Sequence, residues 1–326
     1  MKTLSNRSGI AFAIAAAALT TSAASYADLV SPLQPTPASL SPIATQAPML
    51  AATWAGQRAV SVGGNGIILL SDNRGKSFRQ AQWVPISSTL TGVSFADAKS
   101  GWAVGHWGAI LATTDGGQKW QTQRLVVTED RPLFAVHFFN DKRGVAVGLW
   151  SLVLTTQDSG ETWVEQKLNP KDKALSDLNL LNLFPGTKSD IYATSERGRL
   201  LHSRDAGSTW EYLNTGYEGS LWCGTQLSDG TLLVGGQRGT LLRSEDAGKS
   251  WVRVQLDRTG SITSIDTNGI EVIAIGLDGL RMQSLDGGRT FKDAKDPSEE
   301  SLTAALATQE GKWLLFSRHG VVHNVE

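Results

Sequence analysis

The chain has 326 residues, 40% of them hydrophobic and 19% charged, with 34 glycines and 11 tryptophans. This composition is typical of a globular protein with a large core and argues against disorder. The net charge is −1, and it becomes −3 if Lys2 and Arg7 are removed with the leader described below. Neither value supplies the basic excess that neutralises phosphates, so the sequence argues against a nucleic-acid binder. The only cysteine, Cys223, excludes an intramolecular disulfide.

The first 27 residues have the pattern of a secretory leader. Two basic residues precede an apolar run at residues 10–19, and small residues follow it up to Ala27. We therefore expect residues 1–27 to be a signal peptide cleaved near Ala27, which would place the mature protein in the periplasm or outside the cell. The apolar run is too short for a permanent span, and no later stretch reaches the roughly 20 apolar residues that a spanning helix needs.

Residues 28–48 contain five prolines and precede the first repeat of the chain. Proline fixes one backbone dihedral and has no amide donor, so these residues are predicted to form an extended segment and no helix.

From residue 49 onward the pattern Ser/Thr-x-Asp-x-Gly-x-Thr-Trp occurs six times in exact or slightly varied form, at intervals of 40–47 residues. That period suits one four-stranded blade of a β-propeller. The third residue of the pattern is Asn73, Asp115, Asp158, Asp205, Asp246 and Asp286 in chain order. A short acid or amide bonds the amides ahead of it, and the glycine accepts a positive φ, so the pattern predicts a tight turn between strands. It resembles the Asp-box of sialidase-type propellers, and six copies indicate a structural and not a catalytic role.

Alternating apolar residues predict the strands around these turns. In the second unit they are residues 90–95, 101–105, 109–113 and 120–126. Further inner strands are predicted at residues 134–139, 178–184, 221–227, 262–267 and 302–306.

The last unit has only three predicted strands, at residues 302–308, 313–317 and 321–324. A blade without its edge strand would expose unpaired backbone groups. We therefore predict an all-β fold, a seven-bladed propeller of four-stranded blades over residues 49–326, in which a strand from residues 28–48 closes the last blade.

The second unit also resembles a known family. Gly-Trp-Ala-Val-Gly at residues 101–105 and Asp-Gly-Gly-x-x-Trp at residues 115–120 are similar to motifs of the photosystem II assembly and stability factors of plants and cyanobacteria. The resemblance covers about residues 49–326 and is clearest at residues 92–120. It implies a propeller outside the cytoplasm that binds a partner protein, assists a membrane protein complex and has no catalytic activity. Similar proteins occur in bacteria without photosynthesis, so the resemblance leaves the client protein open.

A carbohydrate-active propeller, either a sialidase-like glycosidase or a glycan-binding protein, is the alternative. Sialidases combine an arginine triad with a tyrosine nucleophile and an acidic partner. Tyr217 is the only tyrosine next to an acid, Glu218, within an expected inter-blade loop, and the Arg-Ile-Pro signature that opens sialidase domains is absent.

The histidines and the cysteine give no sign of a metal or cofactor site. No two of the five histidines have the spacing of ligands on one element, so we expect neither a metal nor a cofactor. His137 is interpreted as a packed or channel-lining residue, and Cys223 as a small buried filler.

The loop between the second and third strands ends at a glycine or small residue in every unit, which aligns the seven loops. The preceding residue is Asn65, Trp107, Trp150, Arg197, Arg238, Asp278 and His319 in chain order. Such variation at a fixed loop position favours recognition over structure, and Trp and Arg are enriched among interface anchors. The other interpretation is that these are ordinary loop residues with partly covered tryptophans.

We predict that this face docks a protein partner, a membrane-associated or periplasmic complex, on a monomeric propeller. The predicted surface consists of Trp107, Trp150, Arg197 and Arg238, with His106, Arg199, Arg318 and His319 at its margins. The loop at residues 169–177 is expected to lie on the same face as a polar rim.

Overall fold

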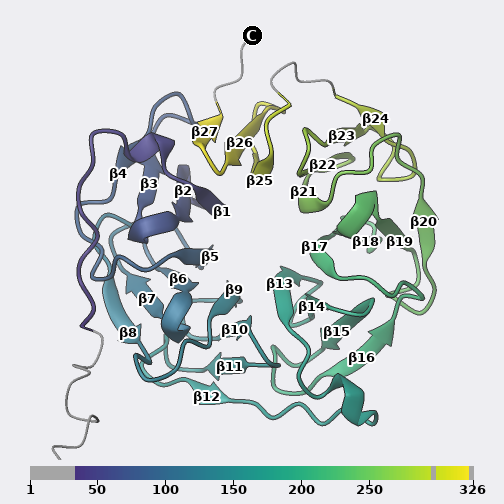
Figure 1. The fold of residues 1–326 in the computed structure, drawn as a ribbon, viewed down its shortest axis with the longest axis horizontal. Helices are drawn as coiled ribbons and strands as arrows, with labels where there is room; N and C mark the ends of the chain where they lie inside the picture. The colour runs from purple at the N-terminus through teal and green to yellow at the C-terminus, as the bar shows by residue number, and fades with distance from the viewer. Residues whose placement is uncertain (1–33, 295–298, 323–326) are drawn as a thin grey trace, which may run out of the picture. The chain divides into compact units, whose positions relative to one another are not determined.

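The computed structural model describes residues 34–294 and 299–322, so the predicted signal peptide lies outside the described residues. Seven antiparallel sheets follow one another along the chain (Figure 1). The described residues form no α-helix, and their only helical elements are short 3-10 turns. The prediction of an all-β, seven-bladed propeller is confirmed.

The blades have the following strands. Blade 1 comprises β1 (Met49–Ala55), β2 (Arg58–Gly63), β3 (Ile68–Ser71) and β4 (Arg79–Gln80). Blade 2 comprises β5 (Leu90–Phe95), β6 (Gly101–Gly105), β7 (Ile110–Thr113) and β8 (Gln121–Arg124). Blade 3 comprises β9 (Leu133–Phe138), β10 (Gly144–Gly148), β11 (Val153–Thr156) and β12 (Val164–Glu165). Blade 4 comprises β13 (Leu180–Pro185), β14 (Ile191–Ser195), β15 (Arg199–Ser203) and β16 (Glu211–Asn214).

Blade 5 comprises β17 (Leu221–Gln226), β18 (Leu232–Gly236), β19 (Leu241–Ser244) and β20 (Val252–Val254). Blade 6 comprises β21 (Ile262–Asn268), β22 (Glu271–Gly276), β23 (Arg281–Ser284) and β24 (Lys292–Asp293). Blade 7 comprises β25 (Leu302–Ala307), β26 (Trp313–Ser317) and β27 (Gly320–Val322). The 3-10 turns are η2 (Ala44–Gln46), η3 (Gly64–Gly66), η4 (His106–Gly108), η5 (Lys173–Leu175) and η6 (Gln237–Gly239).

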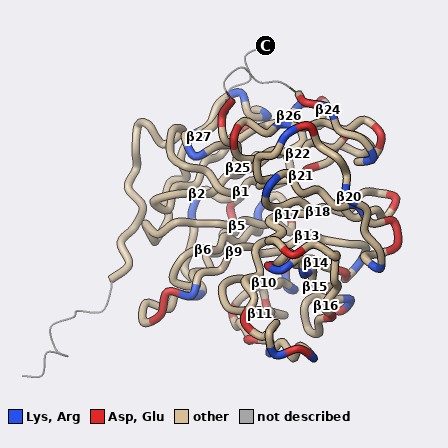
Figure 2. The backbone as a smooth tube through the Cα atoms, turned by 45° about the vertical axis from the view of Figure 1, so that its right-hand side comes forward, with Lys and Arg blue, Asp and Glu red and all other residues tan. Residues whose placement is uncertain are grey.

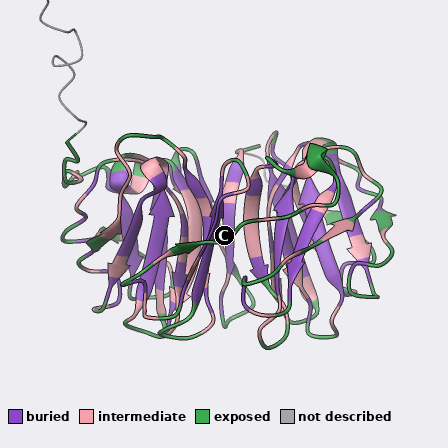
Figure 3. Ribbon diagram, turned by 90° about the horizontal axis from the view of Figure 1, so that it is seen from below, coloured by how far each residue is buried: buried purple, intermediate pink, exposed green. Residues whose placement is uncertain are grey.

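The inner strands meet in chain order around a central cavity, and β25 returns to β1 to close the ring (Figure 1). The second strand of a blade lies between two other strands and between two neighbouring blades, so β6 and β10 are buried at every position. Exposed residues gather in the loops at both ends of the strands (Figure 3). Charged residues of both signs also concentrate in loops and at strand ends (Figure 2). Of the strands predicted for blade 2, β5 and β6 have the predicted bounds, while β7 and β8 begin one residue later.

Blade 7 does not have the predicted fourth strand. Its sheet consists of β25, β26 and β27, and no N-terminal strand among the described residues pairs with β27. Residues 34–48 instead follow the outer side of blade 1, where the Ala38 amide donates to the Val84 carbonyl at 3.0 Å. The Gln80 side chain in β4 accepts from the Ser41 amide and donates to the Ser39 carbonyl, both at 2.9 Å.

The N-terminal segment still reaches the edge of blade 7, but as a turn. η2 contacts both β4 and β27, and Ala44 is buried in the same apolar cluster as Phe316 of β26. Pro42 and Pro48 flank this turn, and prolines cannot donate the ladder bonds of an edge strand. The prediction of closure by a strand is therefore wrong for residues 34–48, and residues 28–33 lie outside the described residues.

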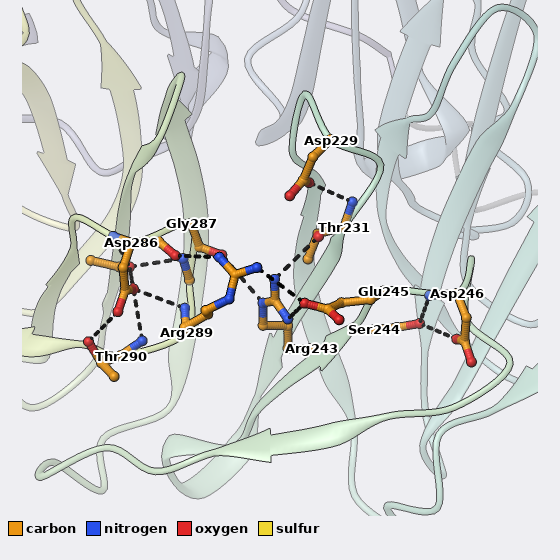
Figure 4. Close-up of polar contacts among 12 residues, drawn as sticks. Asp229, Thr231, Arg243, Ser244, Glu245, Asp246, Asp286, Gly287, Arg289 and Thr290 are labelled. Atoms are coloured by element: carbon orange, nitrogen blue, oxygen red, sulfur yellow. Dashed lines mark hydrogen bonds and ion pairs between the residues drawn. The ribbon is translucent and has the colours of Figure 1, made fainter.

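The Asp-box residues hold the turns between third and fourth strands, as predicted. Asp286 accepts from the Thr290 amide at 2.9 Å and the Thr290 hydroxyl at 2.6 Å (Figure 4). It also accepts from the Ser284 hydroxyl at 2.8 Å. The Ser284 hydroxyl oxygen accepts in turn from the Gly288 amide. Equivalent bonds recur at Asp115, Asp158, Asp205 and Asp246. Each of these carboxylates is occupied by its own turn.

Arginine contacts join the boxes of blades 5 and 6 (Figure 4). Arg243 in β19 donates to the Gly287 carbonyl of the next box at 3.4 Å and pairs with Glu245. Arg289 of that next box reaches Glu245 at 3.4 Å. The bonds from Arg243 to Gly287 and from Arg289 to Glu245 cross between the two blades, so they help fix the blades relative to each other.

Asp246→Asn should preserve the fold and change the pH dependence of its stability. Bonds from the Ser250 hydroxyl and amide lower the Asp246 pKa from 3.8 to about 2. The stabilisation by this depressed pKa is therefore complete above about pH 5 and is lost as the pH falls through about 2. Asn73 already makes the equivalent contacts in blade 1, accepting from the Ser77 amide at 2.9 Å.

Melting temperatures measured from pH 7 to pH 2 test this expectation. The gap between wild type and Asp246→Asn should stay constant above about pH 5 and shrink below about pH 4. Asp257→Asn, at an exposed position outside any box, is the charge-matched control. A gap for Asp246→Asn that is constant down to pH 2 would contradict the role assigned to the carboxylate.

Candidate functional site

The turn between second and third strands has the same backbone in six blades. The varying residue is left-handed in each, with φ of 56° at Asn65, 59° at Trp107, 52° at Trp150, 54° at Arg197, 55° at Arg238 and 56° at Asp278. The following residue is also left-handed, which defines a type I′ turn. Asn and Asp tolerate this conformation, whereas it costs most other residues roughly 1–2 kcal/mol. The conformation of the turn therefore does not explain the presence of Trp and Arg at this position.

These turns share one face with the connections between blades. In an antiparallel four-stranded blade, the turn after the second strand lies at the same end as the start of the first strand. The Leu149 amide accordingly donates to the Pro132 carbonyl just before β9, at 3.0 Å. The Asp-boxes lie at the other end, where the Ser159 amide donates to the Lys142 carbonyl at 3.0 Å.

The turns of blades 2 and 3 are joined by the connection between those blades. Asp130 accepts from the Trp107 amide at 2.8 Å. The next residue, Arg131, donates to the carbonyls of Leu149 at 3.2 Å and Trp150 at 2.8 Å. Two adjacent residues thus hold both tryptophan turns in place.

The turns of blades 3 and 4 are joined in a similar way by Asn179. Its side-chain oxygen accepts from the Trp150 amide at 3.1 Å, while its side-chain nitrogen donates to Glu196 at 3.1 Å. Glu196 immediately precedes Arg197. The Arg197 guanidinium donates to the Ala174 carbonyl at 2.7 Å. The loop at residues 169–177 therefore borders this turn, as predicted.

The connection between blades 4 and 5 joins the two arginine turns. The Gly198 amide donates to the Gly219 carbonyl at 2.7 Å, and the Tyr217 hydroxyl donates to the Gln237 carbonyl at 3.3 Å. Gly198 follows Arg197, and Gln237 precedes Arg238. Trp107, Trp150, Arg197 and Arg238 therefore follow one another across blades 2 to 5 through bonded connections, and we call these four residues the docking arc.

The four residues of the docking arc are not equally exposed. Trp150 has 52% of its surface exposed, and Arg197 and Arg238 are also exposed. Trp107 is only half-buried, because the chain leaving β8 lies beside it and the Val126 amide donates to its carbonyl at 2.9 Å. Of the two tryptophans in the docking arc, Trp150 is therefore the more exposed.

The predicted margin residues fall into two groups. His106 lies in the Trp107 turn with Nδ1 at 3.2 Å from Asp130, and Arg199 begins β15 beside the Arg197 turn. Arg318 and His319 are exposed but belong to blade 7, so blades 6 and 1 separate them from the docking arc. His319 contacts Glu300 at 2.8 Å.

A cavity of about 410 Å³ lies at the arginine end of the docking arc. Its lining includes Tyr217, Glu218, Arg238 and Arg253. The Tyr217 hydroxyl donates to the backbone carbonyl of Gln237 at 3.3 Å and not to a carboxylate base. Two guanidinium groups suit an anionic group of a ligand. The lining contains two arginines, whereas a sialidase uses three.

The remaining sequence candidates are packing residues. The His137 ring packs against Phe139 with ring centres 4.8 Å apart, and burial lowers its pKa to about 4. Cys223 is buried, which raises its thiol pKa, and the prediction of a buried filler is confirmed. Within residues 34–294 and 299–322, no group of three or more His, Cys, Asp or Glu could hold a metal. No helix in the described part of the chain is long and apolar enough to cross a membrane.

A second set of residues on this face, at the mouth of the central cavity, was not predicted from the sequence. Phe134, Leu181 and Trp222 line that cavity from blades 3, 4 and 5. The available signal was a large apolar residue directly after the first leucine of each of these inner strands.

The fold and the face together define the class of protein, an Asp-box β-propeller with its most variable loop residues on one face. Residues 79–174 match the family model described as photosynthesis system II assembly factor YCF48. This match confirms the resemblance to photosystem II assembly factors over blades 2 and 3. A search of curated proteins returns no match.

Two solved structures are similar over nearly the whole chain. One is titled "YCF48 bound to D1 peptide", with a TM-score of 0.71 and 20% identity, covering 89% of this chain and 96% of that one. The other is YCF48 from Cyanidioschyzon merolae, with a TM-score of 0.68 and 15% identity, covering 86% of this chain and 96% of that one. At these identities the likeness establishes the propeller fold.

Proposed function

We propose that this protein is a non-catalytic scaffold that binds a partner protein on the docking arc. The observation that supports this most is the presence of Trp and Arg at turn positions whose backbone favours Asn or Gly. Trp and Arg in this left-handed conformation lower the stability of the fold slightly. A role in recognition explains their presence at these positions. Trp and Arg are also the side chains most enriched among binding hot spots.

The chemistry of the face favours a polypeptide partner. The docking arc has an aromatic end in blades 2 and 3 and a cationic end in blades 4 and 5, which suits a segment with both apolar and acidic side chains. One structurally similar propeller is titled as bound to a D1 peptide. We propose a client in a membrane-associated or periplasmic complex, reached after cleavage of the signal peptide near Ala27, with the propeller acting as a monomer.

A catalytic function has less support than binding. The Asp-box carboxylates are occupied in their turns, and Tyr217 donates its hydroxyl proton to the Gln237 carbonyl. The cavity beside Arg238 favours a carbohydrate ligand. Release of a fluorescent reporter from sialyl or glucosyl substrates at enzyme-like rates would establish glycosidase activity instead.

Two double variants test the docking arc: Trp107→Ala/Trp150→Ala and Arg197→Ala/Arg238→Ala. Each buried anchor typically contributes on the order of 2 kcal/mol, so each variant should bind its partner at least about thirtyfold more weakly. Partners are captured from membranes of the source organism, identified by mass spectrometry and then titrated against the purified proteins.

Asn65→Gly/Asp278→Gly is the matched control, because these residues occupy the same turn position in blades 1 and 6 and glycine accepts its left-handed backbone. This control should bind like wild type. All variants must first have wild-type melting temperatures. If both folded arc variants retrieve the same partners with the same affinity, the docking surface lies elsewhere.

A further inference from the structure

Every inner strand contains a β-bulge at the same place. In each pairing with the second strand, the register shifts around the second residue of the inner strand. The bulged residues are Leu50, Thr91, Phe134, Leu181, Trp222, Thr263 and Thr303. All seven line the central cavity of about 410 Å³, a volume typical of ligand pockets. Bulges re-aim side chains, and here they aim one side chain per blade at the mouth of the cavity.

Three of these residues are threonines with a structural role. Thr91 donates to the Leu133 carbonyl at 2.6 Å, and Thr263 donates to the Leu302 carbonyl at 2.7 Å. Thr303 makes the same bond to Met49 and thereby joins blade 7 to blade 1. Each hydroxyl therefore bonds the first residue of the next blade. At these three bulges, the structural role of the side chain is to bond one blade to the next.

Blades 3, 4 and 5 do not use this bond. Their bulged residues, Phe134, Leu181 and Trp222, have no hydroxyl and give up a hydrogen bond of about 1 kcal/mol in each blade. All three remain half-buried at the cavity. We call them the apolar socket. A large apolar residue that is neither fully buried nor bonded across blades gains little from the fold alone.

The apolar socket is continuous with the docking arc. In blade 3 the Leu149 amide, beside Trp150, donates to the Pro132 carbonyl, two residues before Phe134. In blade 5 the Gln237 amide, beside Arg238, donates to Ser220, two residues before Trp222. Each blade from 3 to 5 thus presents a socket residue at the cavity and a docking-arc residue in the adjoining turn.

We propose that the apolar socket receives one large apolar side chain from an extended segment of the partner, with a carboxylate of that segment bound by Arg197 or Arg238. This inference rests on the proposed function, because it assigns to the docking arc a peptide with a defined anchor. Charge complementarity selects the occupant: the turns beside the socket in blades 4 and 5 each present an exposed arginine. An apolar anchor that fills a pocket, with polar contacts around it, is the usual arrangement of a hot spot.

The test uses Phe134→Thr/Trp222→Thr, because threonine is the residue that three sister blades have at this position. The variant should fold and gain the cross-blade bonds, so a stability loss does not confound the result. Leu50→Thr is the matched control, since Leu50 is the bulged apolar residue of blade 1, away from blades 3 to 5. Equal melting temperatures are checked first.

The probe is a phage-displayed dodecapeptide library selected on the wild-type protein, with the enriched peptides synthesised and titrated by fluorescence anisotropy. Enriched peptides should share a large apolar residue close to Asp or Glu. Their affinity should fall about tenfold or more with Phe134→Thr/Trp222→Thr and stay unchanged with Leu50→Thr.

The outcomes separate this inference from the proposed function. Peptides that lose affinity with the docking-arc variants but bind the socket variant like wild type would overturn the socket and leave the docking arc standing. Peptides indifferent to both sets of variants, or a library that yields no binder, would overturn both. Peptides without any apolar residue would also contradict the socket.

Discussion

Trp120→Ala should destabilise the protein by about 3–5 kcal/mol, the usual loss when a large buried aromatic side chain is cut to alanine. Trp120 has none of its surface exposed and lies in the apolar cluster shared by blades 1 and 2. Its indole nitrogen donates to the Gly117 carbonyl at 2.9 Å, and its ring meets Phe95 edge-on with centres 6.1 Å apart. The truncation leaves a cavity and an unpaired carbonyl together.

Thermal and denaturant unfolding measure this effect, and the melting temperature should fall on the order of 10 °C. Trp150→Ala is the control, because 52% of Trp150 is exposed and little packing is lost. Similar losses for both variants would show that the Asp-box tryptophan does not hold blades 1 and 2 together.

A chain that begins at Met49 should unfold about 2–4 kcal/mol more easily than one with residues 34–48, on the order of 10 °C in melting temperature. The truncation removes buried Ala44 and the backbone bonds to Val84 and to Gly64. It also uncovers the side of β27 that η2 contacts. We expect these lost contacts to outweigh the conformational entropy that residues 34–48 lose when they are ordered against the propeller.

Leu40→Ser/Ile43→Ser is the control for this truncation. These side chains are 70% and 60% exposed, so their replacement should change stability little. Differential scanning calorimetry of the three proteins decides the matter. Equal melting temperatures for the truncated and the longer chain would show that the N-terminal segment does not support the ring.

The docking arc could be predicted because its turns repeat. A glycine or small residue at a fixed place in each unit aligned the seven loops, and Trp150 and Arg238 stood out against Asn65. The structure adds the left-handed backbone at these positions. Trp and Arg in this conformation cost conformational energy, which supports a role in recognition. The exposure of Trp107 could not be predicted, since it depends on how the chain leaves β8.

By itself, the sequence determined the features that depend on neighbours a few residues away. Asp286 bonds Ser284, two positions before it, and Thr290, four positions after it, so the Asp-box pattern predicted the turn. The period of the pattern predicted the number of blades. The three strands of the last unit could also be predicted, because their pattern of apolar residues is local.

Only the tertiary structure decided the features that join distant residues. The apolar socket depends on bulges whose geometry appears when first and second strands pair, and the bond from Thr303 to Met49 crosses 254 positions of sequence. The sequence indicates that residues 28–48 lie outside the repeats, but the place of residues 34–48 along blade 1 follows from contacts with Gln80 and Val84. Local patterns specify which residues can form a strand or a turn, whereas the choice of partner is set by packing between blades.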